Sequence, residues 1–325
     1  MNKLVRELLP FGSLILVVAG LSLWQPDSFL TLDNFLNVLR RSSVYGIIAV
    51  GMTFVIISGG IDLSVGSLLA LCGMCAAGTM IGLAGAEPSA GMPALGTAVG
   101  LLTGAVGGLI SGALITKLKL QPFIATLGTM SLYRGIALVM YDGQPINVSS
   151  YRYLGEGTLA GIPVSVVLFL GVIAAAGAIL QYTRFGRHTY AIGSNLEAAH
   201  HAGVRVDRTL MGIYTLGGLL TGLGAMIAMS RTVSAQPTAG VGAELDVIAA
   251  VVIGGASLSG GRGTITGTIV GTLLISFLRN GCTLVGISTN AQLMVIGVVI
   301  VLAVAVDQFT RSAAQGGQAS VSKRD

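Results

Sequence analysis

Long apolar runs that carry almost no charge recur along the whole chain and restrict what it can fold into. A helix needs roughly 17–25 apolar residues to cross the hydrocarbon core of a bilayer. Ten segments approach this requirement, namely residues 8–24, 32–57, 65–84, 92–115, 121–140, 164–182, 209–230, 245–258, 264–279 and 289–306. The sequence therefore predicts an all-α, polytopic membrane helix bundle with ten transmembrane helices, of which the eighth and ninth are short and interrupted by glycine.

The composition excludes several other classes of protein. Only 10% of the 325 residues are charged and 53% are hydrophobic, whereas soluble proteins carry about 25% charged residues. Disordered chains, nucleic-acid-binding proteins and disulfide scaffolds do not have so little charge. The lipid bilayer is thus the expected surrounding, no nucleic-acid partner is expected, and the net charge of +5 reflects loops rich in Lys and Arg.

The distribution of positive charge predicts the orientation in the membrane. With the N-terminus inside, the inside segments hold Lys3, Arg6, Lys117, Lys119, Arg184, Arg187, Arg205, Arg208, Arg262, Arg311, Lys323 and Arg324. The outside segments hold Arg40, Arg41, Arg152, Arg231 and Arg279, and Arg134 falls within a span. Because Lys and Arg concentrate in cytoplasmic loops, both termini are predicted to be cytoplasmic.

The two ends of the chain are interpreted separately. Lys3 and Arg6 before an apolar run resemble a signal peptide, but no small-residue cleavage pattern follows, so a retained first helix is favoured. Residues 1–311 are predicted to form a single transmembrane domain. The polar residues 312–325 are predicted to be a disordered cytoplasmic tail.

Glycines at a spacing of four mark three of the predicted spans. They are Gly100, Gly104, Gly108 and Gly112, then Gly218 and Gly222, then Gly263, Gly267 and Gly271. This spacing places them on one helix face, where the missing Cβ lets another backbone approach closely. Bundle packing is the favoured interpretation, and a moving interface is the alternative.

Two further glycine clusters contain polar residues and separate neighbouring spans. The first, residues 58–66, includes Gly59, Gly60, Asp62 and Ser64, and the second, residues 254–261, begins with Gly254 and Gly255. Irregular backbone at membrane depth requires protein or a water-filled cavity around it, and broken helices mark substrate paths in transporters. A translocation path or gate and a plain cytoplasmic turn are both open interpretations.

Two charged residues lie close to the apolar core. Asp62 could face the path, or it could accept backbone N–H bonds ahead of Val65 as a helix cap, and the cap is favoured. Arg134 could have a functional role, or it could extend towards the outer interface. Cys72 and Cys75 match a redox spacing, but within an apolar helix they are interpreted as structural thiols.

Catalytic motifs are missing from the sequence. It contains no phosphate-binding Gly-Lys-Ser/Thr, no Gly-x-Ser-x-Gly nucleophile turn and no His-Glu-x-x-His zinc site. We therefore expect no catalytic residues, no metal and no cofactor. The few charges within the spans are too sparse for an ion-coupled carrier, so the energy for transport is expected to come from another subunit.

The basic segment 183–208 is the expected site of contact with that subunit. Asn195 can cap a short helix over 196–202, and Gly203 can end it. Glu197 falls in the first turn, where the helix dipole favours a negative charge. Small residues such as Ala198 and Ala199 would let this helix fit a groove on another protein.

Several motifs in this segment and elsewhere resemble one family. Glu197-Ala198-Ala199 followed by Gly203 resembles the coupling loop of ATP-binding-cassette import permeases. The stretch from Gly186-Arg187 to Asn195 is similar to the version found in ribose-type monosaccharide permeases. So are residues 49–53 with 59–67, 122–129 and 254–264, and together these pieces run in order through most of the chain. His200 and His201 depart from the family pattern.

The resemblance implies a ten-helix permease of the bacterial inner membrane that pairs with a second copy or a paralogue. It further implies cytoplasmic ABC ATPase subunits that press on the coupling loop, and a periplasmic sugar-binding protein that delivers the solute. Site residues implied for coupling are Gly186, Arg187, Asn195, Glu197, Ala198, Ala199 and Gly203. The alternatives are a branched-chain amino acid permease, a self-sufficient carrier or channel and, more remotely, an intramembrane enzyme.

Overall fold

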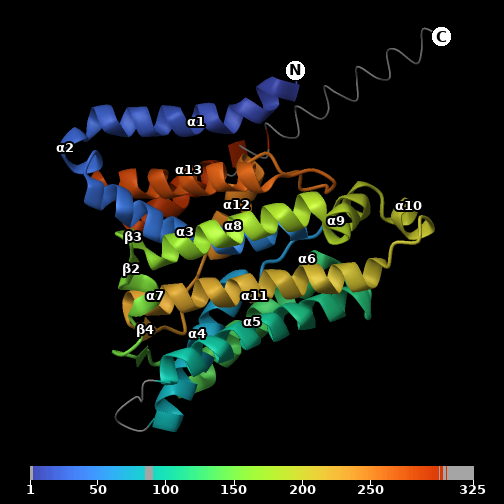
Figure 1. Cartoon of the computed structure of the whole chain (residues 1–325), viewed down its shortest axis with the longest axis horizontal. Helices are drawn as coiled ribbons and strands as arrows, with labels where there is room; N and C mark the ends of the chain where they lie inside the picture. The colour runs from blue at the N-terminus through green and yellow to red at the C-terminus, as the bar shows by residue number, and fades with distance from the viewer. Residues whose placement is uncertain (1–2, 85–90, 300, 303–304, 306–325) are drawn as a thin grey trace.

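The computed structural model describes residues 3–84, 91–299, 301–302 and 305. The predicted tail, residues 312–325, lies outside the described residues. Long helices run side by side through the molecule (Figure 1). They are α1 (Lys3–Trp24), α3 (Leu32–Ile57), α4 (Val65–Ala84), α5 (Met92–Thr116), α6 (Pro122–Val139), α8 (Val164–Tyr182), α11 (Val206–Thr232) and α13 (Ile265–Leu284).

Within the described residues, seven helices are long and apolar enough to cross a membrane. Two shorter apolar helices, Phe11–Trp24 and Thr289–Val299, coincide with the first and last predicted spans. The predicted eighth span is represented by α12 (Ala243–Ile253), which has 11 residues. The all-α membrane bundle is confirmed, and the total of ten spans stays a prediction.

The two longest loops lie at opposite ends of the bundle (Figure 1). One end, which we call the α10 end, carries α9 (Arg184–Ser194) and α10 (Leu196–His201), and α1 begins there. The opposite end, which we call the β end, carries the short elements. These are α2 (Pro26–Phe29), η1 (Met140–Gly143), α7 (Tyr153–Glu156), and the pairs β1 (Ile146–Asn147) with β4 (Ser234–Ala235) and β2 (Thr158–Leu159) with β3 (Ile162–Pro163).

The glycine faces predicted from spacing pack helices closely together. A Cβ at Gly104 or Gly108 of α5 would meet the backbone of α11 at Gly218. Likewise, a Cβ at Gly271 of α13 would meet the Ala250 carbonyl of α12. These contacts confirm the packing interpretation, because any larger side chain would force the helix backbones apart.

Helix α3 lies in the interior of the bundle. Its second half is almost completely buried, with Ile47, Ile48 and Phe54 at 0% exposure. It contacts α11, α8, α12 and α13, so it connects the two halves of the molecule. Helix α1 packs on the outside, where Leu14 and Leu21 lie against a small cluster of Phe29, Val38 and Phe277.

Candidate functional site

The predicted coupling segment folds into two helices. Helix α10 begins after Asn195, whose Oδ1 accepts a hydrogen bond from the Ala198 N–H at 2.9 Å, and Gly203 follows it with a φ of +81°. The short helix, its cap and its glycine stop are therefore confirmed. Glu197 lies exposed in the first turn, whereas Ala199 is buried against Ile192 and Val206.

Helix α9 was not predicted. It begins after Thr183, whose hydroxyl oxygen accepts a hydrogen bond from the Gly186 N–H at 3.2 Å. Arg184 and Arg187 are exposed on it, and Thr189 and Ile192 are buried. The capping threonine followed by this alternation of exposed and buried residues is the signal that could have revealed the helix.

The two polar glycine clusters meet each other and α9 at one point, which we call the junction (Ile57, Gly59, Gly193, Gly260 and Gly261). The Gly261 N–H donates a hydrogen bond to the Ile57 carbonyl at 2.8 Å. A Cβ at Gly193 would clash with that same carbonyl, and one at Gly260 would lie 2.9 Å from the Gly59 Cα. The backbones of three segments distant in sequence are therefore in direct contact.

Tyr190 adds a side-chain link between α9 and the second cluster. Its hydroxyl donates a hydrogen bond to the Gly263 carbonyl at 2.7 Å. Burial raises the pKa of the Tyr190 phenol above its usual range, so the group keeps its proton and remains a donor. Phe185 of α9 packs against Phe54 of α3, with ring centroids 6.1 Å apart. Helix α9 is therefore attached both to α3 and to the turn before α13.

Other glycines of the two clusters allow either a left-handed turn or close backbone packing. Gly59 and Gly255 have φ values of +84° and +92°, a left-handed conformation that favours glycine in both turns. A Cβ at Gly254 would clash with the Gly267 backbone, and one at Gly60 would clash with the Tyr214 hydroxyl. Gly254 thus permits the close approach of α12 to α13.

Asp62 and Ser64 form a compact buried turn ahead of α4. The Asp62 carboxylate accepts hydrogen bonds from the Ser64 N–H at 2.9 Å and from the Ser64 hydroxyl at 2.6 Å. Both residues are at most 1% exposed. Both hydrogen bonds reach Ser64, the residue before α4, and neither reaches an N–H of the first helical turn, so Asp62 stabilises the turn ahead of the helix and the predicted cap of α4 is not formed.

Arg134 binds a different part of the chain, the segment between β4 and α12. One guanidinium nitrogen donates to the carbonyl oxygens of Pro237 at 2.6 Å and Ala239 at 2.9 Å. The guanidinium is therefore bonded within the protein, and its extension towards the outer interface stays a prediction. Arg134 is half-buried and holds the chain between β4 and α12 in place.

Residues 236–242, which connect β4 to α12 and run alongside α4, have no regular secondary structure; we call them the irregular segment. Its neighbour Ala235 lies near Gly73, and Gly240 packs backbone to backbone against Gly66. Helix α12 then rises only about 16 Å, roughly half the hydrocarbon thickness of a bilayer. The sequence predicts a short, glycine-interrupted span over 245–258, and the structure has an even shorter helix, α12, preceded by the irregular segment.

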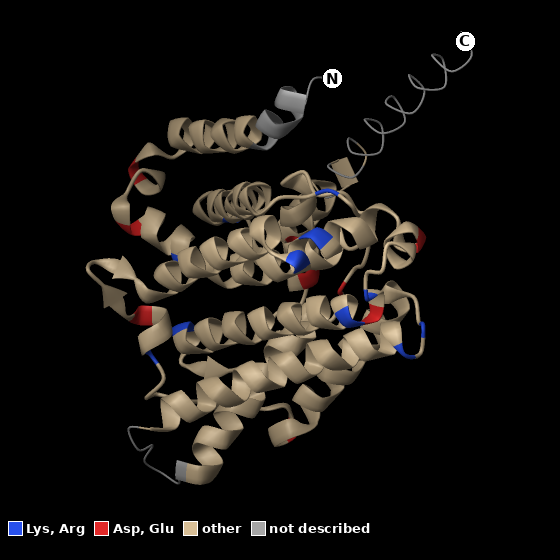
Figure 2. Ribbon diagram, turned by 45° about the vertical axis from the view of Figure 1, so that its right-hand side comes forward, with Lys and Arg blue, Asp and Glu red and all other residues tan. Residues whose placement is uncertain are grey.

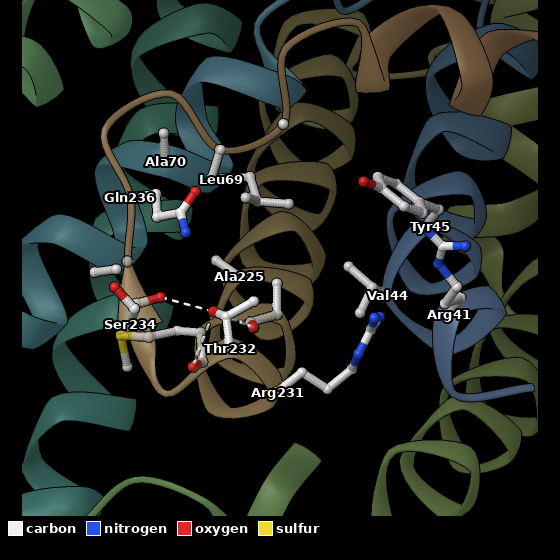
Figure 3. Close-up of a pocket in the computed structure, with 16 residues that line it drawn as sticks. Arg41, Val44, Tyr45, Leu69, Ala70, Ala225, Arg231, Thr232, Ser234 and Gln236 are labelled. Carbon is white, nitrogen blue, oxygen red and sulfur yellow. Dashed lines mark hydrogen bonds between the residues drawn. The ribbon is translucent and has the colours of Figure 1, made fainter. Parts of the chain in front are cut away.

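A cavity of about 230 Å³ lies between the irregular segment and helices α3, α4 and α11. Figure 3 shows Tyr45 and Arg41 extending from α3, Arg231 from α11, and Gln236 from the irregular segment across the open space. Among the described residues, none forms a hydrogen bond or ion pair with Arg41, Tyr45 or Arg231. Their donors are thus available to a ligand in the cavity.

A second cavity of about 230 Å³ lies on the other side of Tyr45, between α3, α12 and α13. It contains a salt bridge in which Arg279 Nη2 lies 2.7 and 2.9 Å from the two carboxylate oxygens of Asp246. Asp246 is 6% exposed, so the pair fixes the short helix α12 to α13. Arg41 and Tyr45 line both cavities and therefore lie between them.

The chain matches known membrane transport proteins over most of its length. The profile described as "Branched-chain amino acid transport system / permease component" matches residues 34–304. The ribose import permease protein of Bacillus subtilis is 47% identical over 311 residues, which cover 94% of each chain. The chain belongs to this permease family.

Two further relatives carry other names. The D-allose transport system permease protein of Escherichia coli is 37% identical over 302 residues, covering 92% of this chain and 90% of the relative. The L-arabinose ABC transporter permease protein of Azospirillum brasilense is 36% identical over 300 residues, covering 92% and 86%. No solved structure matches the chain. The resemblance expected from the motifs is confirmed, and the protein is a multi-pass membrane protein of this family.

The permease contains site residues that sequence reasoning missed. The charge distribution assigns Arg41 and Arg231 to outside segments, and no sequence pattern singles out Tyr45 or Gln236. All four nevertheless line the first cavity, beside the irregular segment. The available signal was the run Gln236-Pro237-Thr238-Ala239-Gly240, because proline and glycine interrupt helices. The predicted residues Gly59, Gly60, Gly254 and Gly255 lie at the α10 end, apart from the cavity.

Proposed function

We propose that the chain is the membrane-spanning permease subunit of an ATP-driven importer for a monosaccharide, a ribose-like pentose or a related sugar. It would span the bacterial inner membrane ten times with both termini in the cytoplasm, and pair with a second copy or a paralogue. Cytoplasmic ABC ATPase subunits would supply the energy, and a periplasmic sugar-binding protein would deliver the sugar. The chain itself would catalyse no reaction.

One observation carries the choice of sugar. The relatives named for ribose, allose and arabinose each cover at least 91% of this chain at 36–47% identity. All three names refer to monosaccharides, although the family profile is named after branched-chain amino acids. The sugar alternative is therefore favoured over the amino acid alternative.

The cavity chemistry is compatible with a sugar. Arg41 and Arg231 offer several N–H donors, and Tyr45 offers a hydroxyl that can donate or accept. A sugar presents hydroxyl groups on every side, so it can satisfy such donors from several directions. The carboxylate of an amino acid could also pair with the two arginines, so the choice between the two solutes rests on the relatives.

The junction suggests how force reaches the cavity. An ATPase that presses on α10 and α9 would move Gly193 and Tyr190 against the turns that end α3 and precede α13. Helix α3 carries Arg41 and Tyr45, and α13 holds α12 through Arg279 and Asp246. Displacing these helices relative to each other would open or close the space beside the irregular segment.

Transport by reconstituted vesicles tests the proposal. Vesicles that contain the permease, its ATPase and its binding protein should take up labelled ribose when ATP is present, and unlabelled leucine should not compete. The variant Tyr45→Phe removes one hydroxyl from the cavity and should weaken uptake, whereas Tyr153→Phe, exposed at the β end, should not.

Three outcomes would reject the proposal in different ways. Uptake of leucine in place of any monosaccharide would favour the amino acid permease. Sugar movement by the purified chain alone, without response to ATP, would favour a self-sufficient carrier. Uptake that persists after deletion of residues 184–203 would reject the coupling mechanism.

A further inference from the structure

The function proposed above assigns no ligand to a large cleft at the α10 end. It has a volume of about 1010 Å³ and lies between the end of α5, the start of α6 and the connection from α10 to α11. Its charged lining residues are Lys117, Lys119, Arg205, Arg208 and Asp207, and His200 and Tyr214 line it as well. Four cationic side chains thus face one carboxylate, and Lys and Arg gather on the loops at this end (Figure 2).

The four cations have no partner in the part of the chain that the structure describes. None of the four side chains takes part in a hydrogen bond or salt bridge there. Asp207, the carboxylate that lines the same cleft, is not paired with any of them. All four side chains are exposed. Lys119 also adopts a φ of +53°, an uncommon conformation for a residue with a Cβ. Like charges held together without counter-charges repel each other, which favours an anion between them.

Apolar residues line part of the cleft and continue from it along α6. Leu120 and Pro122 line the cleft, and Phe123 and Ile124, which are 50% and 54% exposed, follow Pro122 in the first turn of α6. Helix α5 ends at Thr116 and α6 begins at Pro122, so these residues lie where two predicted spans reach the membrane surface. At that depth apolar groups contact acyl chains and cations meet lipid phosphates.

We propose that this cleft binds the headgroup phosphate of an anionic phospholipid, whose acyl chains lie along the exposed start of α6. The four cations surround the phosphate, and Phe123 and Ile124 contact the hydrocarbon. An acidic segment of a partner protein would match the charges but would leave these apolar side chains without a use. The combination of an unpaired basic cleft with an apolar border therefore favours a lipid.

Lipid titration of the purified full-length permease tests the proposal. The probes are phosphatidylglycerol and phosphatidylcholine with identical acyl chains, and native mass spectrometry counts the lipids that remain bound in detergent. The permease should bind phosphatidylglycerol more tightly. The double variant Lys117→Gln with Lys119→Gln should lower that affinity roughly 25-fold, since each basic side chain at an anionic headgroup contributes about fivefold.

Two further variants make the result specific. Lys117→Arg with Lys119→Arg keeps both charges and should retain the lipid. Arg184→Gln with Arg262→Gln removes two exposed cations from the same end, outside the cleft, and should leave the affinity unchanged. All variants change exposed residues, so folding is expected to persist, and their melting temperatures in detergent check it.

Either of two results would overturn the proposal. Equal affinity for the two lipids, or equal loss of affinity in the cleft variant and in the control variant, would mean that the cleft has no specific role in lipid binding. Unchanged lipid affinity together with loss of the ATPase from the purified complex would instead identify the cleft as a protein-docking surface.

Discussion

The hydroxyl of Tyr190 donates a hydrogen bond to the carbonyl oxygen of Gly263 at 2.7 Å. This bond joins α9, which lies outside the helix bundle, to the turn that precedes α13. The adjacent contact of Gly193 with the Ile57 carbonyl joins the same helix to the end of α3. The α9 helix therefore contacts the ends of two long helices at once, which is the geometry that a mechanical link requires.

Removing that hydrogen bond should uncouple sugar transport from ATP hydrolysis without disrupting the assembly of the complex. Tyr190→Phe leaves the ring in place and loses about 1 kcal/mol of hydrogen bonding. We expect the sugar transported per ATP hydrolysed to fall about fivefold, with unchanged recovery of the ATPase complex. Tyr182→Phe is the control, because its side chain is 79% exposed. A normal ratio in Tyr190→Phe would show that the bond transmits no force.

Arg134 should be required for the shape of the cavity. Arg134→Gln removes the donor that serves the carbonyls of Pro237 and Ala239, and hydrogen bonds to charged groups contribute about 1.5–3 kcal/mol. We expect a lower melting temperature in detergent and a severe loss of uptake. Arg152→Gln, which removes an exposed arginine, should change neither quantity. Full uptake by Arg134→Gln would mean that the irregular segment holds its own conformation.

Substitutions of Asp246 and Arg279 should have strongly non-additive effects on the free energy of unfolding, because the two side chains form a salt bridge. Asp246→Ala leaves the Arg279 charge unpaired, which costs about 3–5 kcal/mol for a fully buried pair. Because the Arg279 side chain is 20% exposed, we expect the lower end of this range. The double variant with Arg279→Met should recover much of the stability. Additive losses in a double-mutant cycle would show that the two side chains act independently.

Close packing of α5 against α11 should tolerate no side chain at Gly104. A Cβ there would collide with Gly218 and Gly222, and overpacking costs about 1–3 kcal/mol or more. Gly104→Leu should therefore reduce the yield of folded, assembled permease on size-exclusion chromatography. A Cβ at Gly128 of α6 would meet no other part of the protein within 4 Å, so Gly128→Leu should leave the yield normal. Equal yields for both variants would contradict the packing argument.

Charge reversal in the first turn of α10 should weaken docking of the ATPase. Glu197→Lys places a positive charge at the positive end of a helix dipole, and such effects amount to about 0.3–1 kcal/mol. Pull-down of the ATPase by the permease should fall severalfold. Glu156→Lys makes the same change in the first turn of α7, at the β end, and should have no effect. Equal recovery of the ATPase with both variants would reject the docking role.

The sequence alone determined the class of fold, the family and the local helix signals. Apolar length specifies membrane helices because hydrocarbon cannot hydrogen-bond to the backbone. Glycine spacing predicts close packing, as at Gly104. The helix period puts glycines four residues apart on one face, and that face then has no Cβ atoms to keep a neighbouring helix away. Asn195 and Gly203 likewise specify the limits of α10 through local hydrogen bonding and backbone freedom.

Only the tertiary structure decided which distant segments meet. Arg134 and Pro237 are 103 residues apart, and no local pattern relates the guanidinium to that carbonyl. The same holds for Gly193 beside Ile57 and for Asp246 beside Arg279. The physical reason is that a buried donor or charge must find a partner, but which partner it finds depends on how the helices pack.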